Sequence, residues 1–344
     1  MSPNSKPRTR KGSGTTRRRV LLVGAAGLAA TAAGRRYLRN DEGGLRAEVF
    51  IAKQADYQGD IAGTVLRGLR EIGVDEAATK GKRILLKPNL VEPHPERIPV
   101  NTYPLFVRAV AEAFLRLGAT VVAVGEGQGH RRDSLLVLED SGLLEVLQED
   151  FLRFHDLTVD ELKMVPNAGD HTQFESLGFP GLFDSYDWIV SLPKMKIYHW
   201  AGATLSMKNL FGVMPGIVYG WPKTVLHLQG IENSIVDIYA ALRPHLAIVD
   251  GVVGMEGDGP IMGTAQQAGV IVVGRNFPAV DATCARIMGL RPAAIPYLNI
   301  ASGQLGPIRN ANIKQLGEPY EAVRTDFELV DDIPGHQQLR LATS

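Results

Sequence analysis

Residues 186–212, with the sequence YDWIVSLPKMKIYHWAGATLSMKNLFG, decide how the rest of the chain is interpreted. The stretch opens with an apolar run, residues 188–192, which is typical of a strand buried on both faces of a sheet. Pro193 ends this predicted strand, because proline cannot donate a hydrogen bond to a neighbouring strand. Basic residues follow directly. Buried ammonium groups are costly without partners, so these residues either extend into water or surround something anionic.

Four basic residues of this stretch are the candidate catalytic groups: Lys194, Lys196, His199 and Lys208. Apolar residues lie between them, which favours a segment packed against the body over the alternative, a solvated basic loop. Half-buried lysines can hold carboxylate or phosphate oxygens as point charges. A lysine with a lowered pKa can also act as a base.

Polar residues follow three other predicted strands in the same way. These strands are expected at residues 83–86, 120–124 and 246–249. The polar residues that follow them are Lys87 and Asn89, then Glu126, and then Asp250, Glu256 and Asp258. In open α/β sheets, ligands bind beyond the carboxyl ends of the strands. We therefore expect all of these groups to meet in one cleft.

The chemistry of the side chains indicates their roles in that cleft. We expect Lys87, Asn89 and Asn209 to bind and orient the substrate. Residues 250–260 are predicted to form a glycine-rich loop, and carboxylate oxygens in such a loop suit Mg²⁺, Mn²⁺ or Ca²⁺. A divalent metal ion is therefore the candidate cofactor, and its candidate ligands are Glu126, Asp250, Glu256 and Asp258. The alternative is a glycine turn whose acidic residues are solvated.

Predicted strands and helices alternate along residues 47–290. This alternation predicts an α/β fold, with a mostly parallel sheet and helices on both faces. We expect a single large domain over this range, in which the mixed segment 151–183 forms an inserted subdomain. Residues 37–46 are predicted to be a linker, and residues 291–344 a partly ordered C-terminal extension.

The distribution of charge argues against a nucleic-acid partner. The chain has 37 basic and 37 acidic residues, but residues 1–33 hold seven basic residues and no acidic one. The remainder has 30 basic and 37 acidic residues, whereas non-specific nucleic-acid binding needs a basic surface. Cys284 is the only cysteine, so the chain can form neither an internal disulfide nor a four-cysteine iron–sulfur site.

The first 36 residues have the pattern of an export signal. Arg17 and Arg18 precede a weakly apolar run at residues 20–34, which has an Ala-x-Ala-like end. The arginine pair is similar to that of a twin-arginine signal. We therefore expect the twin-arginine export machinery as a partner and a periplasmic or other extracytoplasmic location. The alternative is an uncleaved signal that tethers the protein to the membrane, although this run is shorter than the roughly 20 residues of a spanning helix.

Four blocks of sequence identify a family. They are ILLKPNLV at residues 84–91, the stretch 187–199, TLSMKNLFG at residues 204–212, and the segment 248–260, which begins IVDG and ends MEGDGP. Together they resemble the family catalogued as domain of unknown function 362, whose name specifies no activity. Some members carry a ferredoxin-like iron–sulfur segment, which a chain with one cysteine cannot ligate, so we expect no such cluster here. The layout is also similar to that of nickel-pincer lactate racemases.

These observations predict an exported α/β enzyme that acts on a small carboxylate or phosphate substrate in a cleft of lysine, asparagine and acidic residues. A metal ion would assist the reaction if the acidic residues bind one. The alternative is a non-catalytic envelope protein that binds the same ligand and leaves it unchanged. A scaffold protein would expose its lysines, and the apolar residues between them disfavour that interpretation.

Overall fold

The computed structural model of the chain describes residues 42–93, 99–129 and 133–341. From Glu42 onward the chain forms one compact unit. The predicted export signal, residues 1–36, and the first part of the predicted linker lie outside the described residues.

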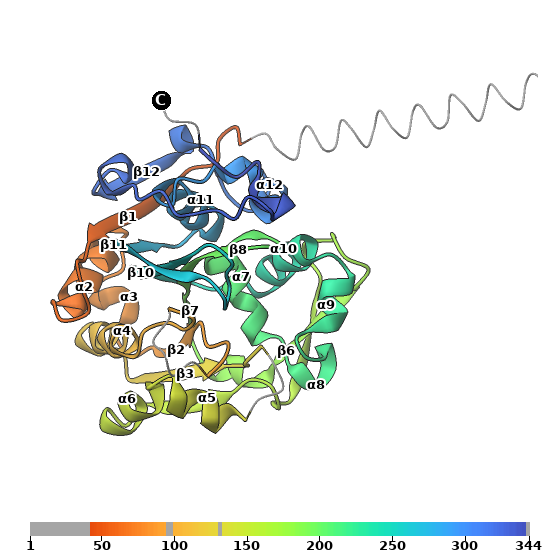
Figure 1. The fold of residues 1–344 in the computed structure, drawn as a ribbon. Helices are drawn as coiled ribbons and strands as arrows, with labels where there is room; N and C mark the ends of the chain where they lie inside the picture. The colour runs from red at the N-terminus through yellow and green to blue at the C-terminus, as the bar shows by residue number, and fades with distance from the viewer. Residues whose placement is uncertain (1–41, 94–98, 130–132, 342–344) are drawn as a thin grey trace, which may run out of the picture. The chain divides into compact units, whose positions relative to one another are not determined.

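A ten-stranded, mostly parallel sheet forms the centre of the described part of the chain (Figure 1). Eight strands lie side by side in the order β12 (Ile313–Gly317), β1 (Ala47–Lys53), β11 (Thr264–Gly274), β10 (Leu246–Glu256), β7 (Trp188–Leu192), β2 (Arg83–Pro88), β3 (Val121–Glu126) and β4 (Arg153–Asp156). β8 (Lys194–Tyr198) pairs with β10, and β9 (Gly202–Thr204) pairs with β8. Because β7, β2, β3 and β4 are all parallel, their carboxyl ends lie at one edge of the sheet.

Helices cover both faces of this sheet, which confirms the predicted α/β class. One face carries α2 (Ile61–Glu71), α4 (Pro104–Arg116), α5 (Ser134–Asp140) and α6 (Leu143–Glu149). The other face carries α7 (Ser206–Asn209), α10 (Ile231–Leu242), α11 (Phe277–Ile287) and α12 (Pro296–Ala301). In Figure 1, α2 and α4 lie on one side of β10 and β7, and α7 and α10 lie on the other.

Shorter elements complete the described fold. α3 (Glu76–Thr79) precedes β2, while α8 (Gly216–Tyr219) and α9 (Thr224–Leu228) follow α7. β5 (Leu162–Pro166) and β6 (Ser176–Pro180) form a separate two-stranded antiparallel sheet within the segment 151–183.

The central strands contribute to both apolar layers. In β1, Phe50 and Ala52 pack with the helices of one face, while Val49 and Ile51 pack with those of the other. This division follows from strand geometry, since successive side chains point to opposite faces. It also explains why these strands are continuous apolar runs instead of alternating ones.

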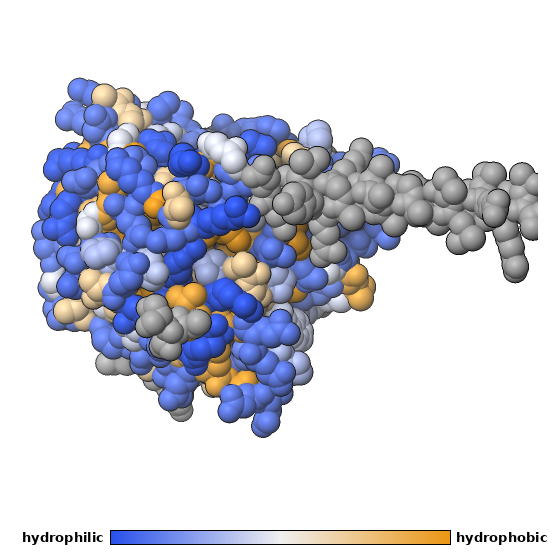
Figure 2. Space-filling model, turned by 90° about the horizontal axis from the view of Figure 1, so that it is seen from above, coloured by the Kyte–Doolittle hydropathy of each residue, from blue (hydrophilic) through white to orange (hydrophobic). Residues whose placement is uncertain are grey.

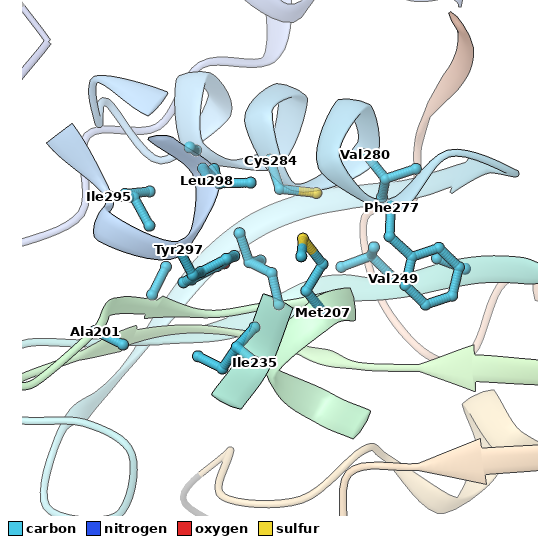
Figure 3. Packing of buried hydrophobic residues seen from close by; sticks show 14 of the residues in the cluster. Ala201, Met207, Ile235, Val249, Phe277, Val280, Cys284, Ile295, Tyr297 and Leu298 are labelled. Carbon is cyan, nitrogen blue, oxygen red and sulfur yellow. The ribbon is translucent and has the colours of Figure 1, made fainter. Parts of the chain in front are cut away.

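The layer between the sheet and α11 is closely packed. Figure 3 shows Val280 and Cys284 on the side of α11 that faces Met207 of α7 and Val249 of β10. Phe277 is fully buried in the same layer, where its ring stacks on that of Tyr239 with 5.1 Å between the ring centroids.

Two features of the sheet differ from the sequence prediction. Pro193 separates β7 from β8 but does not end the sheet, because β8 continues along β10. The loop predicted at residues 250–260 is wrong over its first half, where β10 runs to Glu256 in a hairpin with β11. Both strands contain charged residues, and the apolar-run criterion misses such strands when the charges have partners inside the fold.

The predicted C-terminal extension adds a strand to the sheet. β12 pairs with β1 in parallel, from Ala47 opposite Ile313 onward. The buried carboxylate of Glu42 accepts hydrogen bonds from the Ser302 hydroxyl and the Ile308 backbone N–H. These contacts attach the C-terminal residues to the start of the domain.

The surface carries polar residues over most of the face shown in Figure 2, with separate small hydrophobic areas between them. Within the described residues, no helix combines the length and the apolar character needed to cross a membrane.

We expect the packing of Phe277 to contribute strongly to stability. Phe277→Ala should lower the free energy of unfolding by about 3–5 kcal/mol, because it leaves a cavity under α11. The matched control is Phe151→Ala, since Phe151 is 95% exposed and should contribute little. Urea unfolding of both variants measures the difference, and equal stabilities would contradict the described packing of α11.

Candidate functional site

A cavity of about 260 Å³ lies beyond the carboxyl ends of β2 and β3. Its walls come from those strand ends, from β8, from α7 and from the segment around α9. Seven residues singled out in the sequence line it: Lys87, Asn89, Glu126, Lys196, His199, Lys208 and Asn209. The topology brings them together because β2 and β3 are parallel neighbours that end at the same edge of the sheet.

A buried ion pair joins β2 to β3 at this edge. Lys87 Nζ lies 2.6 Å from Glu126 Oε2, and both side chains are almost completely inaccessible to solvent. The remaining oxygen of Glu126 accepts a bond from the backbone N–H of Gly127. Burial lowers the pKa of Lys87 and raises the pKa of Glu126, while the charge of each partner opposes the shift of the other.

Asn209 fixes the orientation of Lys87. Its Oδ1 accepts a hydrogen bond of 2.9 Å from Lys87 Nζ, and its Nδ2 donates to the backbone carbonyl of Lys87. The same amide nitrogen donates to the Ser191 hydroxyl on β7. Asn209 was predicted to bind the substrate. Its side-chain amide instead forms these hydrogen bonds with other groups of the protein.

Gly212 allows this ion pair to form. A Cβ atom built on Gly212 would lie 1.9 Å from Glu126 Oε1 and 2.6 Å from Lys87 Nζ, so any side chain there would displace the pair. The Gly212 carbonyl also accepts a hydrogen bond from Gly127 N. The close approach gives a physical reason for glycine at the end of the block MKNLFG.

Lys196 lies in the cavity wall without a carboxylate partner among the described residues. The side chain is fully buried, and its Nζ donates to the Val100 carbonyl at 2.6 Å and to the Pro260 carbonyl at 3.4 Å. Burial and the neighbouring charges of Lys194 and Lys208 lower the pKa of Lys196 well below its usual value. The protonated form of this amine is therefore less favoured than that of an exposed lysine.

Lys208 lies on the short helix α7, with its Nζ 3.9 Å from the ring centroid of Phe211 and 5.4 Å from that of Tyr198. Burial, followed by the charges of Lys87 and Lys223, lowers the pKa of Lys208 to about 7. A substantial fraction of this amine is therefore neutral at physiological pH.

Asp281 holds α7 in place from α11. Its buried carboxylate accepts hydrogen bonds from the backbone N–H groups of Ser206 and Met207, the first residues of α7. Such a cap satisfies donors that a helix N-terminus leaves free. Burial raises the pKa of Asp281 to about 7, and the hydrogen bonds from Ser206 oppose this shift.

Two lining residues, Lys223 and His227, were not among the predicted site residues. Lys223 has a left-handed backbone conformation (φ 67°) just before α9, and its Nζ donates to the Met214 carbonyl. Burial lowers its pKa to about 8. His227 Nδ1 lies 3.0 Å from the Lys223 carbonyl, so this nitrogen carries the hydrogen. No motif in the sequence marks Lys223 as a cavity residue.

Asn89 and His199 also line the cavity, and their side chains form fewer hydrogen bonds with the described residues than those of Lys87 and Asn209. Asn89 Oδ1 is buried and has no hydrogen-bond partner within the described part of the chain. His199 Nδ1 lies 3.3 Å from the carboxylate of Asp258, which is largely exposed. Asn89 therefore offers a polar group to a ligand.

Lys194 and Asp250 pair with each other outside this cavity. Lys194 Nζ lies 2.8 Å from Asp250 Oδ2 and 2.6 Å from the Tyr57 hydroxyl. Asp250 also accepts bonds from the Tyr57 hydroxyl and from Tyr103 N. Neither residue is part of the cavity lining, so this predicted catalytic lysine and predicted metal ligand form a buried network between β8 and β10.

The four predicted metal ligands are not gathered at one point. Glu126 pairs with Lys87, and Glu256 accepts a hydrogen bond from Glu328 N. Within residues 42–93, 99–129 and 133–341, no group of three or more histidine, cysteine, aspartate or glutamate side chains is arranged to hold a metal ion. The predicted cluster is not formed because β10 extends through the segment that was expected to be a loop.

We expect the Lys87–Glu126 pair to be sensitive to the loss of one charge. Glu126→Gln should lower the free energy of unfolding by about 3 kcal/mol, because Lys87 is left buried without its counter-charge. The double variant Lys87→Met/Glu126→Gln should lose less than the sum of the single losses.

The control is the exposed pair of Lys163 and Asp184, where Lys163→Met should cost less than about 1 kcal/mol. A loss for Glu126→Gln no larger than that of the control would show that the buried pair does not hold β2 and β3 together.

Three comparisons place the chain among known proteins. It is similar to the thylakoid-associated protein sll1697 of Synechocystis sp. (strain PCC 6803), with 28% identity over 299 residues that cover 82% of this chain and 87% of that protein. A solved structure of a Thermotoga maritima protein matches 68% of this chain and 59% of its own, with a TM-score of 0.40 and 13% identity. The lactate racemase apoprotein from Thermoanaerobacterium thermosaccharolyticum matches 72% and 58%, with a TM-score of 0.43 and 12% identity.

This chain therefore spans less than two thirds of either solved protein, and similarity at this level indicates nothing about activity. The family model described as "Domain of unknown function (DUF362)" matches residues 84–286, more than half of the chain. The protein belongs to this family.

Proposed function

We propose that the protein is an enzyme that acts on a small molecule with a carboxylate or phosphate group, bound in the lysine-lined cavity. The observation that carries this proposal is an imbalance of charge in the cavity wall. Glu126 is the only carboxylate among the described lining residues. Four lysines line the same cavity: Lys87, Lys196, Lys208 and Lys223.

Only one of these four amines has a carboxylate counter-charge among the described residues. Glu126 pairs with Lys87, whereas the other three lysines have no carboxylate within ion-pair distance among the described residues. Desolvation without a counter-charge disfavours the protonated form of an amine, which is the direction of the pKa shifts at Lys196 and Lys208. A bound anion would supply the missing charge and raise these pKa values again.

The size of the cavity suits a small metabolite. Its volume of about 260 Å³ lies below the range of roughly 300–1,000 Å³ that is typical of sites for drug-sized ligands. A compact carboxylate or phosphate compound fits this volume, with Asn89 available as a further polar contact.

Lys208 is the proposed proton-transfer group, because an amine with a pKa of about 7 accepts and releases protons efficiently at neutral pH. Lys196, His199 and Lys87 surround it as charged or polar groups of the same cavity. Of the four predicted metal ligands, Glu126 lines the cavity, and Asp250, Glu256 and Asp258 are not among the lining residues. The competing proposal is an envelope protein that binds the anion without chemistry, and product formation in mass spectrometry distinguishes the two.

We expect anion binding to take up protons. Sulfate is a suitable probe because its own charge stays constant near neutral pH. Since Lys208 is half deprotonated near pH 7 without a ligand and regains its proton when the anion binds, the affinity should fall about tenfold per pH unit above this value. Isothermal titration calorimetry in buffers of different ionisation enthalpy measures both the affinity and the protons taken up.

Lys196→Met should weaken sulfate binding about tenfold or more, because it removes a charged hydrogen-bond donor from the wall. Lys314→Met is the control, since Lys314 is exposed and pairs with Glu48 away from the cavity. Affinity that is independent of pH and unchanged in Lys196→Met would argue against the proposed site.

We further propose that residues 1–36 direct the protein through the twin-arginine machinery. This segment lies outside the described residues, so the proposal depends on its sequence pattern. The name of the Synechocystis relative associates that protein with thylakoids, which is consistent with a location at or beyond a membrane.

Replacing Arg17 and Arg18 by lysine should abolish export in a bacterial host that has twin-arginine translocase, as measured by fractionation and immunoblotting. The matched control replaces Arg35 and Arg36 by lysine and should leave export unchanged. Normal export of the first variant would rule out a twin-arginine signal.

A further inference from the structure

Lys208 differs from the other amines of the cavity in its hydrogen bonding. Lys87, Lys196 and Lys223 each donate to a carboxylate or a carbonyl oxygen. Within the described residues, Lys208 Nζ has no such acceptor, and it lies over the rings of Phe211 and Tyr198. When Lys208 loses its proton, it therefore gives up cation–π attraction but no charge-assisted hydrogen bond to a described residue.

The position of Lys208 also suits a reactive group. It lines the cavity beside Asn209, on a helix that Asp281 fixes through two backbone hydrogen bonds. A neutral lysine amine in a partly apolar pocket, next to other cationic groups, is the arrangement in which lysine acts as a nucleophile.

We propose that Lys208 is a nucleophile that forms an imine with a small carbonyl compound bearing a carboxylate or phosphate group. This inference rests on the proposed anion site. Lys196 and Lys223 would hold the anionic group of the substrate, so that the carbonyl carbon and not the anion faces Lys208. The neutral fraction of Lys208 would then attack that carbon. The substrate class is thus narrowed to 2-oxo acids and phosphorylated aldehydes or ketones.

The reaction balances without an added oxidant or reductant. The lone pair of Lys208 Nζ forms a bond to the carbonyl carbon, and the carbonyl oxygen takes a proton to give a carbinolamine. The nitrogen then forms a double bond to this carbon, and the oxygen leaves as water with both amine protons. The products are one imine and one water for each amine and carbonyl consumed.

We assign Lys223 as the proton relay: it would donate a proton to the leaving oxygen and recover one from the Lys208 nitrogen, so water still leaves with the two amine protons overall. It lines the same cavity, and its charge is close enough to influence Lys208. Because the pKa of Lys223 is lowered only to about 8, this amine is still mostly protonated at the pH where half of Lys208 is neutral.

Reductive trapping tests the proposal directly. The full chain is incubated near neutral pH with cyanoborohydride and, in separate reactions, pyruvate, 2-oxoglutarate or dihydroxyacetone phosphate. We expect the mass of one reduced adduct, mapped by peptide mass spectrometry to Lys208, with at least one of these probes. Excess sulfate should suppress this adduct, while any adduct at the N-terminal amine should persist and serves as an internal control.

Two variants and one binding measurement complete the test. Lys208→Arg should lose the adduct, whereas the exposed-site control Lys163→Arg should retain it. If sulfate binds in calorimetry but none of the three probes modifies Lys208 in the wild-type chain, the imine proposal is overturned and the anion site stands. If sulfate does not bind, the proposed function fails as well. Because the adduct is mapped on the wild-type chain, this outcome does not depend on whether a variant folds.

Discussion

The ion pair between Lys87 and Glu126 is the interaction on which the cavity depends. It joins the ends of β2 and β3 at a point where both side chains are buried, and Asn209 connects it to α7. Gly212 leaves the space that the pair occupies. The pair is therefore both a structural tie between neighbouring strands and one wall of the site, so the geometry of the site follows from the geometry of the sheet.

A second constraint concerns charge. With Lys87 matched by Glu126, the other lining lysines have no carboxylate partner in the described part of the chain, and burial lowers the pKa values of Lys196 and Lys208. A protein gains no stability from such an arrangement, because desolvation of each amine is uncompensated. In the proposed function this arrangement serves binding, because a small anion would restore the missing charge.

The sequence predicts the fold class well, because apolar strands and amphipathic helices alternate along the chain. It also indicates Lys87, Glu126 and Lys196, which lie at or just beyond the ends of predicted strands, and Lys208, which follows in the same basic stretch. It misplaces Lys194 and Asp250, because nothing local shows that two charged residues 56 positions apart neutralise each other inside a sheet. Lys223 and the cap formed by Asp281 are missed for a related reason: both depend on contacts between segments that are distant in sequence.

The central claim is that the protonation state of lysines in the cavity depends on whether an anion is bound. The most direct measurement is an NMR titration of lysine side chains labelled with ¹³C at Cε, with and without saturating sulfate, in which the Lys208→Arg variant assigns the signal. The account predicts one lysine that titrates near pH 7 in the free protein and at clearly higher pH with sulfate. Titration of every lysine near its ordinary value of about 10.4, with no change on addition of sulfate, would contradict it.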